Sequence, residues 1–383
     1  MDTIQQLKLL SQDMDLEADG EGHCQPIVGG KGFAEIPISE AVMPNGRRIK
    51  LLKTMLTSAC ERNCYYCPFR AGRDMRRATF KPEEMAKVFI SLEKAKIVEG
   101  IFLSSGIIKG GVRTQDKLLD TADILRNKYQ YRGYLHMKIM PGAEQAQVER
   151  AMQLASRVSV NLEAPNTKRL GRLAPLKEFT EELLTPLMWI EQIRKESPPQ
   201  NSWNGQWASS ATQFVVGAAG ESDLELLSTS EKLFNQARLK RIYYSGFNPI
   251  SDTPLDYLPR ENPWRQHRLY QSSYLFRDYG FTLEEMPFSP EGNLPLDIDP
   301  KLAWAQSNLL NQPMEINRAE EHELLRIPGI GPKAAKAIMN AQGKEKLRSL
   351  GDLKRLGIHY KRAIPFILLD GKQPAHQQAL FSL

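Results

Sequence analysis

Hydrophobic residues follow two alternating patterns between residues 51 and 245. Short, β-prone apolar runs are separated by longer stretches in which apolar residues recur every three or four positions, as Leu183, Leu187 and Ile190 do. The short runs predict strands at Leu51–Leu56, Gly100–Leu103, Tyr134–Ile139, Arg157–Leu162, Thr212–Val216 and Arg241–Tyr244. The longer stretches predict helices at Pro82–Lys96, Gln115–Lys128, Ala143–Leu154, Phe179–Lys195 and Ser222–Gln236.

This alternation of strands and helices is typical of a parallel sheet with helices outside it. Six strand–helix units favour an open, partial (βα)6 barrel of the TIM type over a closed eight-fold barrel. We therefore predict an α/β fold for this region.

The pattern weakens on both sides of the predicted barrel. The first fifty residues are polar and rich in Gly and Asp, with a short predicted helix at Ile4–Leu10, and a later segment is dense in Pro and aromatic residues. A second, all-helical pattern begins near Asn317. The predicted division is an N-terminal extension (1–50), the partial barrel (51–245), an irregular extension wrapping the barrel (246–316), a helical module (317–372) and a tail (373–383).

The composition is that of an ordinary soluble globular protein, with 41% hydrophobic and 25% charged residues. The net charge of +6 is concentrated in residues 321–372, which hold eleven Lys or Arg against five Asp or Glu, while the rest of the chain is balanced. A localised basic module favours a polyanionic partner. The N-terminus lacks a signal-peptide pattern and no apolar run is long enough to span a membrane, so we expect a cytoplasmic protein.

Three of the four cysteines lie within eight residues, in the pattern CxxxCxxC formed by Cys60, Cys64 and Cys67. This triplet directly follows the first predicted strand, at the end of the barrel where such folds build their active sites. Three thiolates can ligate three irons of a cubane and leave the fourth iron open. The alternative is a structural zinc site, which needs four Cys or His ligands, and the nearest histidines are His23 and His136.

The spacing and the aromatic Tyr66 before the last cysteine resemble the radical S-adenosylmethionine (SAM) superfamily. The resemblance implies a [4Fe–4S] cluster held by Cys60, Cys64 and Cys67, with the amino and carboxylate groups of SAM on the open iron. It also implies that one electron splits SAM into methionine and a 5′-deoxyadenosyl radical, which removes hydrogen from an unactivated carbon. An external electron donor such as flavodoxin or ferredoxin is part of this expectation.

The same resemblance implies SAM contacts at successive strand ends. Residues 104–106 stand where the family often has a Gly-Gly-Glu-like element for the SAM amino group, although the acidic residue is missing here. The end of the fourth strand suits the ribose hydroxyls or the methionyl carboxylate, and residues 216–221 resemble a glycine-containing adenine turn. The alternative is that these residues do not contact SAM and are ordinary turn residues and a surface charge. The predicted SAM-contact set is Ser104, Ser105, Gly106, Asn161, Glu163, Gly217 and Glu221.

Two further features lie outside the triplet. The segment after Cys67 carries four arginines, Arg70, Arg73, Arg76 and Arg77, which suit either phosphate contact or a solvated loop. Cys24 could donate hydrogen to a substrate radical, as a cysteine does in spore photoproduct lyase, but a free, inert cysteine is the favoured interpretation. No second cysteine set exists for an auxiliary cluster, which argues against sulfur insertion and methylthiolation.

The segment Glu323–Ile338 resembles a helix–hairpin–helix motif. Its Gly-Ile-Gly turn permits a tight hairpin, and Pro332 suits the first position of the next helix, whose N-terminal N–H groups favour an anion. The resemblance implies a grip on duplex phosphate without sequence reading. A weaker copy at Leu353–Ala363 has one glycine in its turn, so we expect a poorer grip and a packing role there. The predicted DNA-binding residues are Gly329, Ile330, Gly331, Lys333 and Lys336.

From Lys50 to Lys372 the chain resembles bacterial radical SAM proteins described as DNA modification or repair proteins, often encoded beside a partner with the uracil-DNA-glycosylase fold. Three further segments share in the resemblance: Tyr243–Pro249, His267–Gln271 and Asp299–Trp304. The resemblance implies repair or modification of a DNA base, which must leave the helical stack to reach a barrel. The alternatives for the protein are an RNA-modifying radical SAM enzyme and a non-catalytic iron–sulfur DNA-binding protein. The alternative for the helical module is a helical hairpin used for protein contacts.

Overall fold

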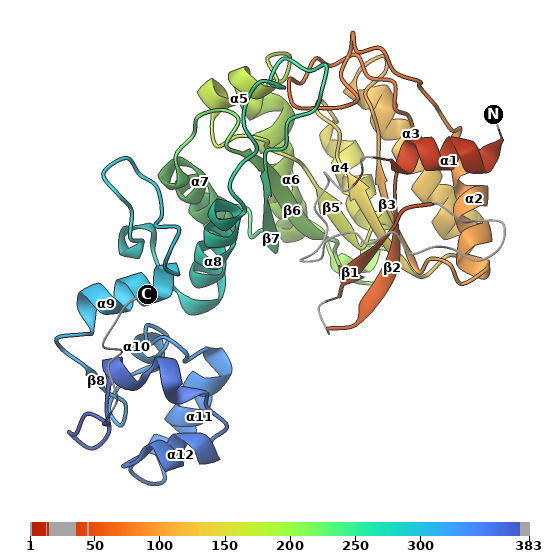
Figure 1. The fold of residues 1–383 in the computed structure, drawn as a ribbon. Coiled ribbons are helices and arrows are strands. Elements are labelled where there is room, and N and C mark those ends of the chain that lie inside the picture. Colours follow the sequence, from red (N-terminus) through yellow and green to blue (C-terminus); the bar gives the residue numbers. More distant parts are fainter. Residues whose placement is uncertain (1, 13, 15–35, 44–45, 376–383) are drawn as a thin grey trace. The chain divides into compact units, whose positions relative to one another are not determined.

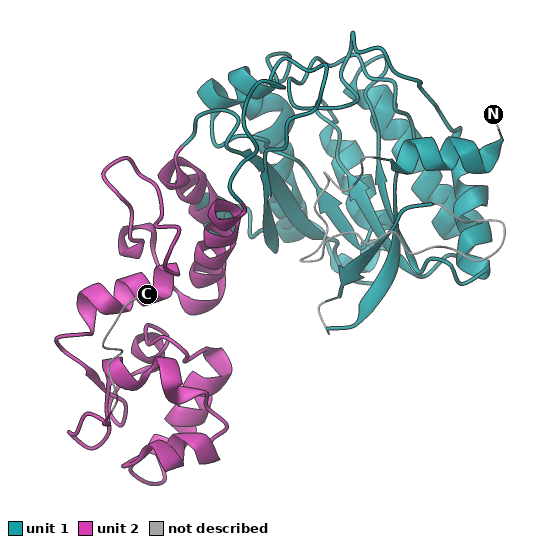
Figure 2. Ribbon diagram, in the orientation of Figure 1, with its two compact units in different colours: residues 1–221, 232–262 teal, residues 222–231, 263–383 magenta. Residues whose placement is uncertain are grey.

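The computed structural model describes residues 2–12, 14, 36–43 and 46–375. The chain divides into two compact units, one of residues 1–221 and 232–262 and the other of residues 222–231 and 263–383 (Figure 2). The first unit holds the predicted barrel except residues 222–231, and the second unit holds the predicted helical module.

The first unit is built on a seven-stranded sheet whose strands are paired in chain order, from β1 to β7 (Figure 1). β1 pairs antiparallel with β2, and every later pair is parallel. β1 and β7 form the two edges, so the sheet is an open partial barrel and the α/β prediction is confirmed. The strands are β1 (Ile38–Val42), β2 (Arg48–Met55), β3 (Gly100–Ser104), β4 (Tyr134–Lys138), β5 (Arg157–Ser159), β6 (Ser209–Val216) and β7 (Arg241–Gly246).

Helices follow the parallel strands, and neighbours pack against each other, α2 on α3 and α3 on α4. α2 shows why such a segment is helical. It starts with a proline at its first position, and the Lys81 N–H donates to the Glu84 carboxylate at 2.9 Å, while Met85, Phe89 and Leu92 form its buried face. The helices of this unit are α1 (Thr3–Ser11), α2 (Pro82–Lys94), α3 (Gly111–Asp123), α4 (Gln145–Leu154), α5 (Thr167–Leu173) and α6 (Thr185–Glu196), and α7 (Asp223–Gln236) crosses between the units.

The structure differs from the predicted pattern at several places, and two of them have a clear physical reason. The N-terminal extension contributes β1, a short edge strand in which only three of five residues are buried, so its periodicity is faint. The segment expected to be irregular contains α8 (Pro263–Tyr279) and α9 (Pro300–Asn308). α8 buries polar residues, including Arg268, Ser272 and Ser273, beside its few apolar ones, which removes the apolar stripe that identifies most helices.

The second unit has a hydrophobic core of its own. Its short elements are α10 (Glu321–Leu324), α11 (Pro332–Gln342), α12 (Leu350–Arg355) and the parallel pair β8 (Met314–Glu315) and β9 (Ile367–Leu368). The core is formed by fully buried side chains from these elements and their turns, among them Ile316, Leu324, Ile327, Ile330, Ile338, Leu353 and Ile367. Within the described ranges, no helix combines the length and apolarity that crossing a membrane requires.

Candidate active site

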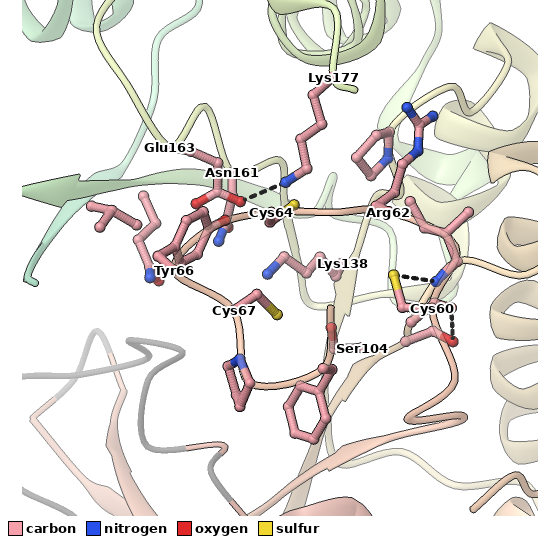
Figure 3. A pocket seen from close by; sticks show the side chains of 18 of the residues that line it. Cys60, Arg62, Cys64, Tyr66, Cys67, Ser104, Lys138, Asn161, Glu163 and Lys177 are labelled. Carbon is pink, nitrogen blue, oxygen red and sulfur yellow. Dashed lines mark hydrogen bonds and ion pairs between the residues drawn. The ribbon is translucent and has the colours of Figure 1, made fainter. Parts of the chain in front are cut away.

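The three cysteines lie on the loop that follows β2, and all three line one pocket at the carboxyl ends of the parallel strands (Figure 3). Because these strand ends meet at one edge of the sheet, residues far apart in the chain converge there. Every parallel strand contributes, either from its last residues or from the segment that follows it. The polar lining residues include Ser104, Ser105, Lys138, Asn161, Glu163, Lys177, Gln213, Ser245 and Asn248.

Backbone hydrogen bonds fasten the cysteine loop to the segment that follows β3. The Gly106 N–H donates to the Thr57 carbonyl at 2.7 Å, and the Glu61 N–H donates to the Ile107 carbonyl at 2.8 Å. The Cys60 sulfur accepts the Ile107 N–H at 3.4 Å. These bonds extend the pairing of two parallel strands into the loops and fix the position of the first cysteine.

Gly106 is needed for this close approach. A Cβ atom at this position would lie 2.2 Å from the Ala59 carbonyl oxygen, a backbone atom that cannot swing aside. Gly106 also lines the pocket, and its contact with SAM stays a prediction.

Burial affects the protonation of two of the thiols, Cys64 and Cys67. Desolvation raises the pKa of Cys64 and of Cys67, and Lys177 partly opposes this rise. Thiolates at these positions therefore need a positive centre beside them, which the irons of a cluster supply. Among the described residues no histidine lines the pocket, and no three His, Cys, Asp or Glu side chains are grouped as ligands of a single ion. A cubane does not need three ligands grouped around one ion, because each cysteine ligates a different iron.

A buried ion pair lies beside the thiols. The Lys177 ammonium is 3.0 Å from Oε1 of Glu163, and the two side chains are 9% and 4% exposed (Figure 3). Burial opposes ionisation of Glu163, but Lys177 first, then Lys138 and the nearby Tyr66 hydroxyl, hold the pKa of that carboxyl below its usual range. Oε2 of Glu163 is buried without a hydrogen-bond partner in the described part of the chain. It is an acceptor available to a hydroxyl donor in the pocket.

The backbone at Glu163 is held in an uncommon conformation. Its φ of +64° lies in the left-handed region, which is costly for a residue with a Cβ. Two hydrogen bonds to β6 hold it there: the Glu163 N–H donates to the Gln213 carbonyl at 2.9 Å, and the Val215 N–H donates to the Glu163 carbonyl at 2.8 Å. The strained backbone aims the carboxylate at the pocket.

Five of the seven predicted SAM-contact residues line the pocket with the cysteines: Ser104, Ser105, Gly106, Asn161 and Glu163. The other two, Gly217 and Glu221, are not among its lining residues, and their contact with adenine stays a prediction.

The Glu221 carboxylate caps the turn that contains Gly217, accepting the Gly217 N–H and, at 3.1 Å, the Ala219 N–H. Gly217 has a φ of +100°, and a Cβ there would meet the Glu261 carboxylate. Cys24 lies outside the described residues.

Sequence reasoning missed Lys138, Lys177 and Gln213. Lys138 and Gln213 sit within predicted strands, where a lone polar residue carries no signal of its role, and Lys177 follows α5 in a segment without a motif. Phe247 and Asn248 also line the pocket, and they belong to a segment that the resemblance had singled out without a role.

The second unit presents a groove of about 520 Å³ between two hairpins. The first hairpin contributes Gly329, Gly331, Lys333 and neighbours, and the second contributes residues 356–359. Ile330 is buried in the core, while Lys333 and Lys336 are exposed. The second copy of the motif therefore shares the groove of the first, and its weaker grip stays a prediction.

Lys301 supports the first hairpin from inside the unit. Its ammonium donates to the Ile330 carbonyl at 2.6 Å and lies 4.6 Å from the centre of the Tyr279 ring. Since the N–H and C=O of a trans peptide point in opposite directions, the Gly331 N–H points away from Lys301. With the first N–H groups of α11, which have no partner within the helix, it forms a set of donors for an anion.

No family model and no curated protein matches the chain. Among solved structures, the FeFe-hydrogenase maturase HydG from Carboxydothermus hydrogenoformans has a TM-score of 0.46 and 14% identity over 59% of this chain and 51% of HydG. Methylornithine synthase (PylB) has a TM-score of 0.46 and 13% identity over 59% of this chain and 61% of PylB. OxsB, a cobalamin-dependent S-adenosylmethionine radical enzyme, has a TM-score of 0.35 and 10% identity over 79% of this chain and 50% of OxsB. The chain thus spans about half to three-fifths of these proteins.

Replacing Gly106 by Ala is expected to destabilise the protein by about 2 kcal/mol, because the new methyl group overlaps the Ala59 carbonyl. Gly171→Ala is the matched control, since this glycine lies in α5 with nothing within 4 Å of the point that a Cβ would occupy, and it should gain up to about 1 kcal/mol. Urea unfolding measures both. Equal stability of the two variants would contradict the proposed close packing.

Lys177→Met is expected to destabilise the cluster-free protein by about 3–5 kcal/mol, because it leaves the buried Glu163 carboxylate without its counter-charge. The double variant Glu163→Gln with Lys177→Met should recover most of this loss. Lys195→Met is the control, since its ammonium is an exposed partner of Glu191. A loss below about 1 kcal/mol in Lys177→Met would show that the pair is not a buried charge pair.

Proposed function

We propose that this protein is a radical SAM enzyme, with a [4Fe–4S] cluster held by Cys60, Cys64 and Cys67. The observation that carries the proposal is the shared pocket, in which the CxxxCxxC thiols meet polar side chains from the ends of the parallel strands. The donor set fits a cluster: three thiols, of which Cys64 is buried and Cys60 and Cys67 are half-buried, lie near an ammonium, and among the described residues no histidine lines the pocket as a fourth ligand.

The pocket residues have separate roles in this proposal. When bound, the cluster supplies the electron that splits SAM into methionine and a 5′-deoxyadenosyl radical. Ser104 and Ser105 offer hydroxyl oxygens to the SAM amino group, while Asn161 and the free Oε2 of Glu163 receive the ribose hydroxyls. The turn that contains Gly217 and Glu221 lies after β6. Because of this place in the chain, we assign it the contact with the adenine ring of SAM.

Apolar side chains complete the pocket. Met55, Phe69, Ile139 and Met140 line it and are at least nine-tenths buried. They enclose a bound ligand in an apolar wall, which keeps a reactive radical apart from other reactants.

The substrate we propose is a base in DNA, for repair or modification. Support comes from the excess positive charge in residues 321–372 and from the donors of the Gly329–Gly331 hairpin. The base must leave the stack, at a cost of a few kcal/mol that damage would lower. An electron donor such as flavodoxin or ferredoxin, a partner with the uracil-DNA-glycosylase fold and a cytoplasmic location belong to the same proposal.

Reconstituted protein with dithionite and SAM under anaerobic conditions is expected to form 5′-deoxyadenosine, and Cys64→Ala is expected to abolish it, because two thiolates cannot hold the cubane. Cys24→Ala is the control and should retain this uncoupled cleavage. Chromatographic detection of 5′-deoxyadenosine decides the outcome. Its absence from the wild-type protein, with the cluster present, would favour the non-catalytic alternative.

The double variant Gly329→Ala with Gly331→Ala is expected to weaken duplex DNA binding about tenfold, since alanine is strained at the φ of +85° of Gly329. Uncoupled SAM cleavage should be unchanged. Gly343→Ala, in the same module with open space around it, is the matched control. Fluorescence anisotropy against salt concentration measures binding.

Unchanged duplex affinity in the double variant would remove the hairpin from the proposal. Preference for tRNA over duplex DNA in competition would favour the RNA-modifying alternative.

A further inference from the structure

The loop that carries the cysteines is closed at its base. Residues 78–80 return antiparallel to residues 56–58, with the Ser58 N–H donating to the Ala78 carbonyl at 3.0 Å and the Phe80 N–H to the Leu56 carbonyl at 2.9 Å. The Thr57 and Thr79 hydroxyls lie 2.6 Å apart. Residues 59–77 therefore form a loop whose two ends are held side by side.

The Arg77 guanidinium binds four backbone carbonyls of this loop. Nη1 donates to Ser58 at 2.6 Å and to Phe69 at 2.8 Å, and Nη2 donates to Arg70 at 2.8 Å and to Arg73 at 3.2 Å. Ser58 stands two residues before the first cysteine, and Phe69 stands two residues after the last one. One planar group thus ties the chain that enters the triplet to the chain that leaves it.

These bonds leave Arg77 little capacity to bind a substrate phosphate. Each Nη carries two hydrogens, and all four are used by the loop's own carbonyls. Arg77 is not among the residues that line the pocket, and within the described ranges no carboxylate forms an ion pair with it. Its neighbour Arg76 is exposed. The arginines after the triplet therefore have different roles, and that of Arg77 is internal to the loop.

We propose that Arg77 is the positioning residue of the cluster-binding loop, which it holds in the shape that presents all three thiols before the cluster arrives. This inference rests on the proposed function, because it assumes that the loop binds a [4Fe–4S] cluster. A preformed loop loses less conformational entropy when the cluster binds, so the cluster is retained longer. A guanidinium suits the task because its rigid planar fork reaches several acceptors at once, whereas an ammonium is a point donor.

The test compares Arg77→Lys, Arg77→Met and Arg76→Met with the wild type, in the full-length protein after anaerobic reconstitution. The readouts are iron and sulfide per chain, the EPR spectrum of the reduced cluster with and without SAM, and the rate at which an iron chelator bleaches the cluster. Thermal unfolding of each protein without cluster reports the stability of the fold. Arg76→Met controls for the loss of one positive charge from the same loop.

We expect both Arg77 variants to lose the cluster at least about tenfold faster than the wild type, because losing one hydrogen bond to a charged donor is worth about that factor. Arg76→Met should match the wild type. Full retention in Arg77→Lys would overturn the inference, since charge alone would then suffice. If Arg77→Met does not fold, Arg77→Lys decides in the same way.

The failure of this inference is distinguishable from failure of the proposed function. A wild-type protein that holds no [4Fe–4S] cluster would remove the proposed function, and the role of Arg77 would fall with it. A wild type that holds the cluster, beside Arg77 variants that hold it equally well, would remove the role of Arg77 alone.

Discussion

Gathering three thiol groups in one pocket, with Cys64 buried and Cys60 and Cys67 half-buried, is the constraint on which the rest of the first unit depends. Burial raises the pKa of Cys64 and Cys67, so their thiolates persist only beside positive charge. In our account the irons of the cluster supply most of that charge, and Lys177 adds a fixed part of it. An ammonium this deeply buried needs a carboxylate of its own, and Glu163 provides it. The strained backbone at Glu163 and its bonds to β6 follow from that need.

The two units carry different chemistry on separate hydrophobic cores. In the first unit, parallel strands bring polar side chains to one edge of the sheet, where a small ligand can be surrounded. In the second unit, tight hairpins place backbone N–H groups and the exposed Lys333 along a groove, and we propose that an extended anion binds there. In our proposal the charge excess of residues 321–372 follows this division, because only binding of a polyanion would need a positive surface.

Much of the first unit could be predicted because strands buried on both faces and amphipathic helices leave strong periodic signals. All six parallel strands were placed within a few residues of their observed bounds. β1 and α8 were missed, since a short edge strand and a helix that buries polar residues have no such signal. The cysteine triplet could be found from its spacing. The sequence did not predict the roles of Lys177 and Lys138 or the carbonyl contacts of Arg77, because these depend on tertiary positions that no local pattern encodes.

The central claim is that the three thiols hold a cubane with one iron left open for a small chelating ligand. Purification without oxygen, followed by metal and sulfide analysis, tests it most directly. The account predicts a brown protein with about four iron and four sulfide per chain. A colourless protein that carries zinc, without iron or sulfide, would contradict it.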